Sequence, residues 1–176
     1  MEMEQALQKK QKQTKFKAKL DRLGSRPLDT LTAKLVGCGK QCPFCKAPCE
    51  AGAAFHEAHH VKIHRPKGLG RYRYEDSEEL CTSICTSSVF SDGKFRNSDT
   101  KGEWHSFKEY KTLYGDWNIP ADNSYAASDY WKYVMVRFNK DFAKCYNAEP
   151  ADIPNEWTTI SKEDADRSLK DSFNVK

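Results

Sequence analysis

The spacing of apolar residues predicts one long helix over residues 128–146. Its apolar side chains recur at helical intervals, and basic residues lie mostly on the opposite side. Ser128 followed by Asp129 is typical of a helix N-terminus, where a hydroxyl caps the first turn and a carboxylate favours the helix dipole. Shorter helical patterns occupy residues 4–22, 28–36, 106–114 and the segment that opens at Ser161-Lys162-Glu163-Asp164, a sequence that resembles a capping box.

Residues 80–90 are apolar, β-branched and rich in Ser and Thr, a pattern that fits a short helix as well as a strand. The turn sequence Ser91-Asp92-Gly93 follows, so Lys94-Phe95-Arg96 is expected to form a return strand. Together these patterns predict an α+β fold that is mainly α. The long helix, which contains Trp131, is expected to bury one face against Trp104, Trp117 and Trp157, so that the four tryptophans form the core of the second half.

Residues 37–73 differ from the rest because they are dense in Cys, His, Gly and Pro and hold few large apolar side chains. Such a stretch cannot order itself by burying apolar surface alone. We therefore expect three parts. Residues 1–26 form a basic arm, either helical or partly disordered, and residues 27–73 form a helix plus a Cys/His module. Residues 74–176 form a mainly helical, Trp-rich half that packs with the module as one domain.

Length and composition exclude several classes of protein. The chain of 176 residues fits one domain with an arm, and its 38% apolar fraction lies below the roughly 45–50% of globular chains. No apolar run approaches the ~18 residues of a membrane span, and the Lys-rich N-terminus lacks the apolar stretch of a secretory signal. Seven cysteines, an odd number, indicate a reducing compartment and metal or free thiols rather than a disulfide scaffold.

The net charge of +4 conceals an uneven distribution. Residues 1–26 hold eight basic and three acidic residues, a net charge of +5, and residues 34–73 hold eight and two, a net charge of +6. Residues 74–176 hold 13 basic and 19 acidic residues, a net charge of −6. The small total is therefore a difference between oppositely charged parts. The net charge of the whole chain therefore says little about nucleic-acid binding. The opposite charges of the Cys/His segment and the helical half favour docking of one on the other.

Cys42-Pro43-Phe44-Cys45 precedes a histidine pair, His60 and His64, at the spacing C-x2-C-x14-H-x3-H. Zinc prefers four tetrahedral thiolate and imidazole ligands, and a tight C-x2-C turn directs two sulfurs at one ion while a histidine pair supplies two nitrogens. We expect Cys42, Cys45, His60 and His64 to hold one structural Zn²⁺. Further cysteines are alternative ligands and leave a second ion open; they are Cys38, Cys49 and Cys85.

Other interpretations of these residues carry less support. Cys42 and Cys45 could form a thioredoxin-like redox pair, but that motif should lie between a strand and a helix of a βαβ unit, which the pattern lacks. His56 and His59 are expected to be solvated loop histidines. The remaining cysteines are expected to be buried as small apolar side chains, and they are Cys81 and Cys145.

No catalytic constellation stands out in the sequence. A catalytic zinc keeps an open position beside an acid or base, whereas four soft ligands at this spacing are typical of a closed structural site. The sequence His56-Glu57-Ala58-His59 is one residue short of the H-E-x-x-H motif, and Gly37-Cys38-Gly39-Lys40 is not a phosphate-binding loop. We therefore expect no enzymatic activity.

A basic strip surrounds the histidine pair and is interleaved with Tyr72 and Tyr74; it consists of Lys62, Arg65, Lys67, Arg71 and Arg73. The strip fits a phosphate or single-stranded nucleic-acid surface. It also fits a solvated face of a small module, whose long basic side chains cover apolar surface with their stems. We prefer the second interpretation.

A longer series of residues extends over most of the chain in a recognisable order. Its members are Gly37-Cys38, Gln41-Cys42-Pro43-Phe44-Cys45, Cys49, His60, His64-Arg65-Pro66, Gly68, Cys85, Tyr110, Asp116-Trp117, Ile119, Tyr130-Trp131-Lys132, Phe138, Ile153-Pro154 and Trp157. The series resembles the C-terminal region of the interferon-inducible very large GTPases. The resemblance covers residues 28–172 and is specific because the Cys-Pro-Phe-Cys, His-Arg-Pro and Tyr-Trp-Lys pieces keep their order and spacing.

The resemblance implies a family of very large cytosolic and nuclear proteins that carry a dynamin-like GTP-binding domain and are induced in innate immune responses. The residues of this chain hold no P-loop, so GTPase activity is not carried over and no nucleotide ligand is expected. We expect an isolated tail, a gene fragment or a short paralogue of the family. The implied localisation is cytoplasmic and also nuclear.

These observations predict a zinc-stabilised module packed on a helical C-terminal half, with a non-catalytic structural or protein-interaction function. Its expected partner is another protein or a second copy of the chain, and no membrane contact is expected. The alternative is a zinc-dependent nucleic-acid-binding module that uses the basic strip over residues 62–73.

Overall fold

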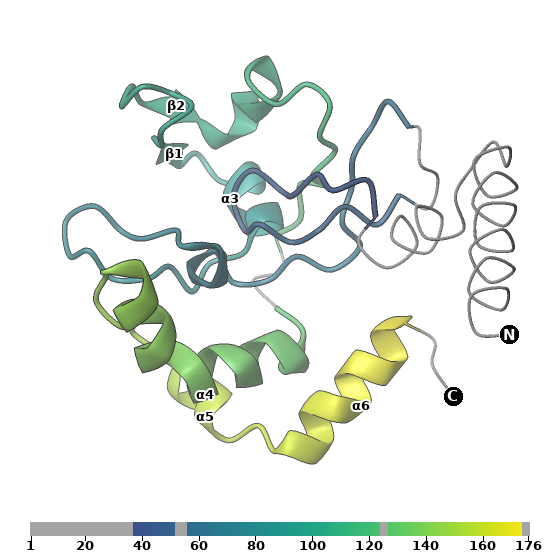
Figure 1. Cartoon of the computed structure of the whole chain (residues 1–176), viewed down its shortest axis with the longest axis vertical. Helices are drawn as coiled ribbons and strands as arrows, with labels where there is room; N and C mark the ends of the chain where they lie inside the picture. Colours follow the sequence, from purple (N-terminus) through teal and green to yellow (C-terminus); the bar gives the residue numbers. More distant parts are fainter. Residues whose placement is uncertain (1–36, 52–55, 124–126, 174–176) are drawn as a thin grey trace, which may run out of the picture.

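The computed structural model describes residues 37–51, 56–123 and 127–173. The predicted helix at 28–36 and the basic arm over 1–26 lie outside these residues. The described chain combines short helices with one two-stranded sheet, so the expected mixture of α and β structure is confirmed (Figure 1). None of the described helices is both long enough and apolar enough to cross a membrane.

The described elements follow one another in a simple order. They are the 3-10 helix η1 (Lys67–Gly70), the helix α3 (Cys85–Phe90), the strands β1 (Lys94–Phe95) and β2 (His105–Ser106), the 3-10 helix η2 (Phe107–Thr112), and the helices α4 (Asp129–Tyr146), α5 (Asn155–Thr158) and α6 (Lys162–Phe173). Figure 1 shows β1, β2 and η2 on one side, α4, α5 and α6 on the opposite side, and α3 with the Cys-rich loops between them.

The expected return strand forms, but its partner is not the 80–90 segment. β1 pairs antiparallel with β2, so that Lys94 lies opposite Ser106. The second half of the 80–90 segment is the helix α3 instead. The helix accommodates its buried serines because the hydroxyls of Ser87 and Ser88 donate hydrogen bonds to the Ile84 carbonyl at 3.0 Å and 2.9 Å.

Helix α4 matches the helix predicted for residues 128–146. It begins after Ser128 and ends at Asn147, which adopts a left-handed φ of 51°. The expected cap of α6 is present, because the Asp164 amide donates a hydrogen bond to the Ser161 hydroxyl at 3.1 Å. α4 packs against α5 and along α6, so the C-terminal helices form one layer (Figure 1).

The buried side chains form two clusters. The first lies around the Cys-rich loops and includes Phe44, Val61, Val89, Phe95, Phe107, Tyr110, Trp117 and Ile119. The second lies between η1 and the C-terminal helices and consists of Leu69, Leu80, Met135, Ala143, Ala151 and Trp157. The first cluster contains residues from both sides of position 73, which is the boundary that the sequence suggested between the Cys/His module and the helical half.

The four tryptophans do not share one core as expected. Trp117 belongs to the first cluster, Trp157 belongs to the second, and Trp131 packs half-buried against the second. Trp104 is 54% exposed, and the Arg96 guanidinium lies 5.1 Å from its ring centroid. Of the three tryptophans expected to pack against α4, only Trp157 shares its cluster.

The 3-10 helix η1 lies between the two clusters and passes very close to the backbone and side chains on both sides. A Cβ at Gly70 would lie 2.6 Å from the Cys45 carbonyl, and a Cβ at Gly68 would lie 2.8 Å from the Cys81 carbonyl oxygen and from Met135 Cε. Only a residue without a side chain fits at these two positions. The glycines therefore allow η1 to bring the Cys-rich loop close to α4.

Candidate metal centres

Four buried residues from three segments bring their ligand atoms together, and we call Cys42, Cys45, His64 and Cys85 the Cys3His group. The four atoms lie within 4.8 Å of one another. Nδ1 of His64 lies 3.7 Å from Cys42 Sγ and 3.5 Å from Cys45 Sγ, and the sulfurs of Cys42 and Cys85 lie 3.7 Å apart. Ligand atoms around a tetrahedral zinc lie roughly 3.5–3.8 Å apart for these pairs. The group therefore fits one metal ion.

The C-x2-C turn places its two sulfurs through a short hydrogen-bonded loop. The Lys46 amide donates to the Cys42 carbonyl at 3.0 Å, and the Cys42 amide donates to the Ala47 carbonyl at 2.8 Å. Lys46 closes the turn with a left-handed φ of 59°. Both sulfurs of the turn consequently face the interior, where Cys42 and Cys45 are fully buried.

The other two ligands come from later segments that are fixed to this loop. The Nε atom of Arg65 donates to the Cys45 carbonyl at 2.8 Å and so holds the segment of His64 in place. Cys85 is the first residue of α3. The second ring nitrogen of His64, Nε2, is buried and has no hydrogen-bond partner among the described residues. Nδ1 is therefore the nitrogen that His64 offers to the group.

The three thiols of the Cys3His group have different pKa values. Hydrogen bonds from Cys42 and Cys85 hold the pKa of Cys45 well below its usual value. The hydrogen bond with Cys45 raises the pKa of Cys42 to about 12, and burial raises the pKa of Cys85. A bound divalent cation would favour the ionised form of all three thiols, because metal ligands of this type must be deprotonated.

A buried lysine lies beside the group. Lys67 is 4% exposed, and its ammonium donates a hydrogen bond to the Ser88 hydroxyl at 2.8 Å. The ammonium also lies 4.4 Å from the ring centroid of Phe107 and 5.0 Å from that of Tyr72. Burial lowers the pKa of Lys67, and the nearby cysteine thiolates act in the opposite direction. None of the ion pairs among the described residues gives Lys67 a carboxylate partner.

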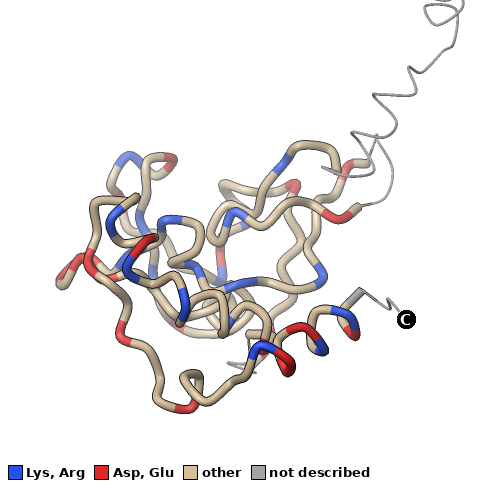
Figure 2. The backbone as a smooth tube through the Cα atoms, turned by 60° about the horizontal axis from the view of Figure 1, so that its bottom comes forward, with Lys and Arg blue, Asp and Glu red and all other residues tan. Residues whose placement is uncertain are grey.

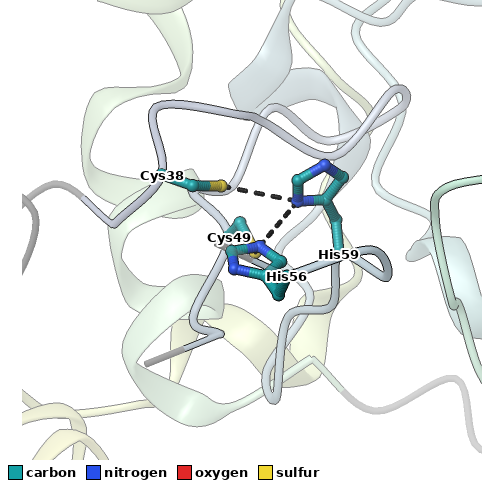
Figure 3. A group of neighbouring side chains, drawn as sticks. All are labelled: Cys38, Cys49, His56 and His59. Atoms are coloured by element: carbon teal, nitrogen blue, oxygen red, sulfur yellow. Dashed lines mark hydrogen bonds between the residues drawn. The ribbon is translucent and has the colours of Figure 1, made fainter. Parts of the chain in front are cut away.

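A second set of converging side chains lies in the same loops, and we call Cys38, Cys49, His56 and His59 the Cys2His2 group (Figure 3). Its ligand atoms also lie within 4.8 Å of one another. Cys38 Sγ lies 3.4 Å from His59 Nδ1, and Cys49 Sγ lies 3.4 Å from His56 Nε2. This arrangement also fits a metal ion by the type and number of its ligand atoms.

The structure distributes the sequence-predicted ligands over these groups. Cys42, Cys45 and His64 come together as expected, and Cys85 completes their set in place of His60. His60 is exposed and belongs to neither group. Cys38 and Cys49, which the sequence also marks as potential ligands, belong to the Cys2His2 group.

Two expectations about neighbouring residues are wrong. His56 and His59 are not solvated loop residues, because both side chains point toward the two cysteines of the Cys2His2 group and His59 is only 7% exposed. Cys145 is not buried, because α4 buries Met135 and Ala143 on another side of the helix and leaves Cys145 exposed. The expectation for Cys81 is confirmed, since it is 2% exposed.

The sequence contains a signal for the Cys2His2 group that the C-x2-C and H-x3-H spacings do not reveal. Cys38 and Cys49 lie four residues outside Cys42 and Cys45 on either side. The two arms of this loop pair, because the Cys49 amide donates to the Lys40 carbonyl at 2.9 Å. A loop that brings the inner cysteines together therefore also brings the outer cysteines together.

The five residues of the basic strip do not share one surface. Lys67 is buried, and the Arg65 guanidinium stacks 5.5 Å from the ring centroid of Trp131. The exposed members are Lys62, Arg71 and Arg73. Figure 2 shows basic and acidic positions interspersed along the described chain. Nucleic-acid binding through the strip stays an untested prediction.

A groove of about 670 Å³ lies beside the first cluster, between the segment after η1 and the strand β1. Two exposed aromatic side chains line it: Tyr74, which is 46% exposed, and Trp104, which is 54% exposed. Its arginines are paired with glutamates, in the ion pairs Arg73–Glu78 and Arg96–Glu75. The groove also contains Lys94, which is exposed and joins none of the ion pairs among the described residues.

Comparison with known proteins gives a consistent result. Residues 38–169, which include both Cys/His groups, match the family described as "Interferon-induced very large GTPase 1, C-terminal domain". The chain is 33% identical over 147 residues to Interferon-induced very large GTPase 1 of Mus musculus, covering 80% of this chain and 6% of the relative. It is 32% identical over 161 residues to the Homo sapiens protein of the same name, covering 83% of this chain and 6% of that relative. No solved structure matches the chain.

Proposed function

The chain belongs to the family of the C-terminal domain of interferon-induced very large GTPase 1, and from that premise we propose that it is a non-catalytic protein-interaction module stabilised by zinc. The observation that carries the proposal is the Cys3His group, which four buried side chains form. The chain spans about 6% of the length of its curated relatives and holds no phosphate-binding loop, so the proposal does not include the activity in their name.

The chemistry of the Cys3His group favours zinc. Thiolate and imidazole ligands in a four-coordinate set are the usual ligands of structural Zn²⁺, whereas Mg²⁺ and Ca²⁺ prefer oxygen. Three thiolates around a divalent cation leave a net charge of −1. The buried ammonium of Lys67 lies where it would balance that charge, which accounts for a buried lysine without a carboxylate partner.

The same geometry supports a structural role for the metal. A catalytic zinc site keeps one position for water or substrate, whereas this group offers four protein atoms, enough to fill all four positions of a tetrahedral ion. Every residue of the Cys3His group is also buried, which is typical of a structural rather than a catalytic site. The zinc ion would therefore supply folding free energy, on the order of 10 kcal/mol, by joining three separate segments.

X-ray absorption spectroscopy at the zinc edge tests the closed, sulfur-rich site. We expect a sulfur shell at ~2.3 Å and a light-atom shell of nitrogen or oxygen at ~2.0–2.1 Å, with more sulfur than light-atom ligands. His64→Ala should remove one nitrogen ligand, whereas His60→Ala should leave the spectrum unchanged because His60 is exposed outside both groups. A wild-type spectrum with more light-atom than sulfur ligands would instead favour an open, catalytic zinc site.

The interaction role rests on the groove that Tyr74 and Trp104 line. Exposed aromatic side chains beside charged residues are typical of protein-binding surfaces. We propose that the groove binds a polypeptide segment with an apolar anchor for Trp104 and a carboxylate for Lys94. A different protein or a second copy of the chain could supply such a segment.

Selection from a displayed peptide library tests this surface. We expect the chain to enrich peptides that combine an aromatic or aliphatic residue with Asp or Glu, and Trp104→Ser or Lys94→Glu should lower their affinity at least tenfold. Phe138→Ser is the matched control because Phe138 is also 45% exposed but lies on α4, away from the groove. Peptides that bind all these variants equally would place the interaction surface elsewhere.

The cellular setting of the chain is proposed from its family and from its free thiols. The curated relatives are named as interferon-induced proteins, so we propose a role for this chain in innate immune responses. Free thiols fit a reducing compartment, which favours the cytoplasm and the nucleus. Transcript and protein levels after interferon treatment, together with imaging of the endogenous protein, test both points.

A further inference from the structure

We propose that the Cys2His2 group binds a second zinc ion and that the Asp116 carboxylate orients one of its ligands. The proposal goes beyond the Cys3His site because it uses none of that site's ligands. Its first support is convergence: one sulfur or nitrogen atom from each of Cys38, Cys49, His56 and His59 lies within 4.8 Å of the other three. Figure 3 shows the two imidazoles and the two thiols facing a common centre.

The distances agree with a tetrahedral ion. The two sulfur–nitrogen separations of 3.4 Å are close to the ~3.5 Å expected around zinc. The nitrogens of His56 and His59 lie 2.8 Å apart, so a bound ion would move these rings apart by about half an ångström to reach the ~3.3 Å expected for two nitrogens. A single cation satisfies all four lone pairs at once, whereas a proton is shared by only two atoms.

The strongest support is the position of the two nitrogens of His59. Nδ1 faces the group, while Nε2 lies 3.4 Å from Oδ2 of Asp116. A hydrogen-bond acceptor at the remote nitrogen of a metal-bound histidine fixes the tautomer and the ring orientation, and a carboxylate is one of the usual acceptors. His59 thus has the environment of a ligand rather than that of a solvated loop residue.

The backbone holds His59 in this orientation independently of any ion. The His59 amide donates to the Asp116 carbonyl at 2.6 Å, and the Asn118 amide donates to the His59 carbonyl at 2.8 Å. The ring also packs 5.4 Å from that of Trp117, a residue of the first cluster. The segment around Asp116 therefore positions both the ligand and its carboxylate.

The cysteine side of the group is equally constrained. Gly37 has a left-handed φ of 68°, and a Cβ at this position would lie 2.3 Å from the Cys49 carbonyl oxygen. The chain therefore passes close to Cys49 immediately before Cys38, which only glycine permits. This close approach brings the two thiols, eleven residues apart in the sequence, to the same centre.

Zinc content of the purified full-length chain tests the second site. Native mass spectrometry should find two zinc ions per wild-type chain and one in His59→Ala, while the adjacent control His60→Ala should retain two. One ion in all three proteins would overturn the second site and leave the Cys3His proposal intact. No ion in the wild-type chain would overturn both, and two ions in His59→Ala would overturn the assignment to these ligands.

Asp116→Asn provides a milder test in case His59→Ala does not fold. The amide preserves the size of the side chain but removes the negative charge beside Nε2, so we expect one of the two zinc ions to bind roughly 10–100-fold more weakly. Competition with a chromophoric chelator measures this affinity, and circular dichroism checks that the fold is kept. Equal affinities in the wild type and Asp116→Asn would contradict the orienting role of the carboxylate.

Discussion

Replacing Cys85 by serine should cause a large loss of stability, as should the loss of any other ligand of the Cys3His group. Cys85 is fully buried and joins α3 to the C-x2-C turn through the Cys3His group. A serine hydroxyl is a poor zinc ligand, and structural zinc contributes on the order of 10 kcal/mol of folding free energy. Since a whole domain is stable by only about 5–15 kcal/mol, much of this module should unfold.

The measurement combines metal content with thermal unfolding followed by circular dichroism. We expect Cys85→Ser to lose one zinc ion per chain and to unfold at least roughly 10 °C below the wild type, because each kcal/mol shifts the midpoint by about 2–4 °C in a chain of this size. A strong chelator should lower the midpoint of the wild-type protein by at least as much, because it removes the ion of the Cys3His group and any ion of the Cys2His2 group. Cys145→Ser is the matched control, since Cys145 is exposed and outside both groups. An unchanged midpoint in Cys85→Ser would refute a structural metal at this site.

Phe44→Ala should also have a large effect, and for a different reason. Phe44 lies inside the C-x2-C turn, is fully buried, and has the rings of Phe95 and Phe107 at centroid distances of 4.9 Å and 5.0 Å. Three tyrosine rings lie farther out around it, those of Tyr72, Tyr110 and Tyr114. Truncation would leave a cavity at the centre of the first cluster, which typically costs about 3–5 kcal/mol.

Chemical denaturation with excess zinc present isolates this packing effect from metal loss. The folded variant should keep its metal, because Phe44 contributes no ligand atom. Phe138→Ala should change the free energy of unfolding by less than about 1 kcal/mol, because Phe138 is 45% exposed. If both phenylalanine variants lost the same small amount of stability, the aromatic cluster would not be a packed core.

Strong local patterns allow some elements to be predicted. Helix α4 follows residues 128–146 closely because an apolar stripe over several turns has only one compatible period. The cap at Ser161 is predictable for the same reason, since its hydrogen bond involves a residue only three positions away. The inner cysteine pair is also local, because the C-x2-C turn determines the relative positions of Cys42 and Cys45.

Long-range choices cannot be predicted from one sequence. His59 and His60 are adjacent in a segment without helical or strand periodicity, so spacing does not show that only His59 faces inward. Its orientation depends on Asp116, which lies far along the chain. Cys85 likewise reaches the Cys3His group only because the start of α3 lies against the C-x2-C turn. The exposure of Trp104 is equally unpredictable from the sequence. A tryptophan that lines a groove beside an arginine has the same local sequence features as a tryptophan in the core.

The order of the Cys3His ligands along the chain has a consequence for biosynthesis. Cys42, Cys45 and His64 leave the ribosome well before Cys85 does. A nascent chain that captures zinc at this stage has only three protein ligands, and water or a small cellular thiol would complete the coordination. The arrival of Cys85 with α3 displaces that ligand and closes the site. The zinc ion would thus have an exchangeable ligand only in the unfinished polypeptide. Once Cys85 replaces that ligand, the ion would no longer be accessible to other molecules.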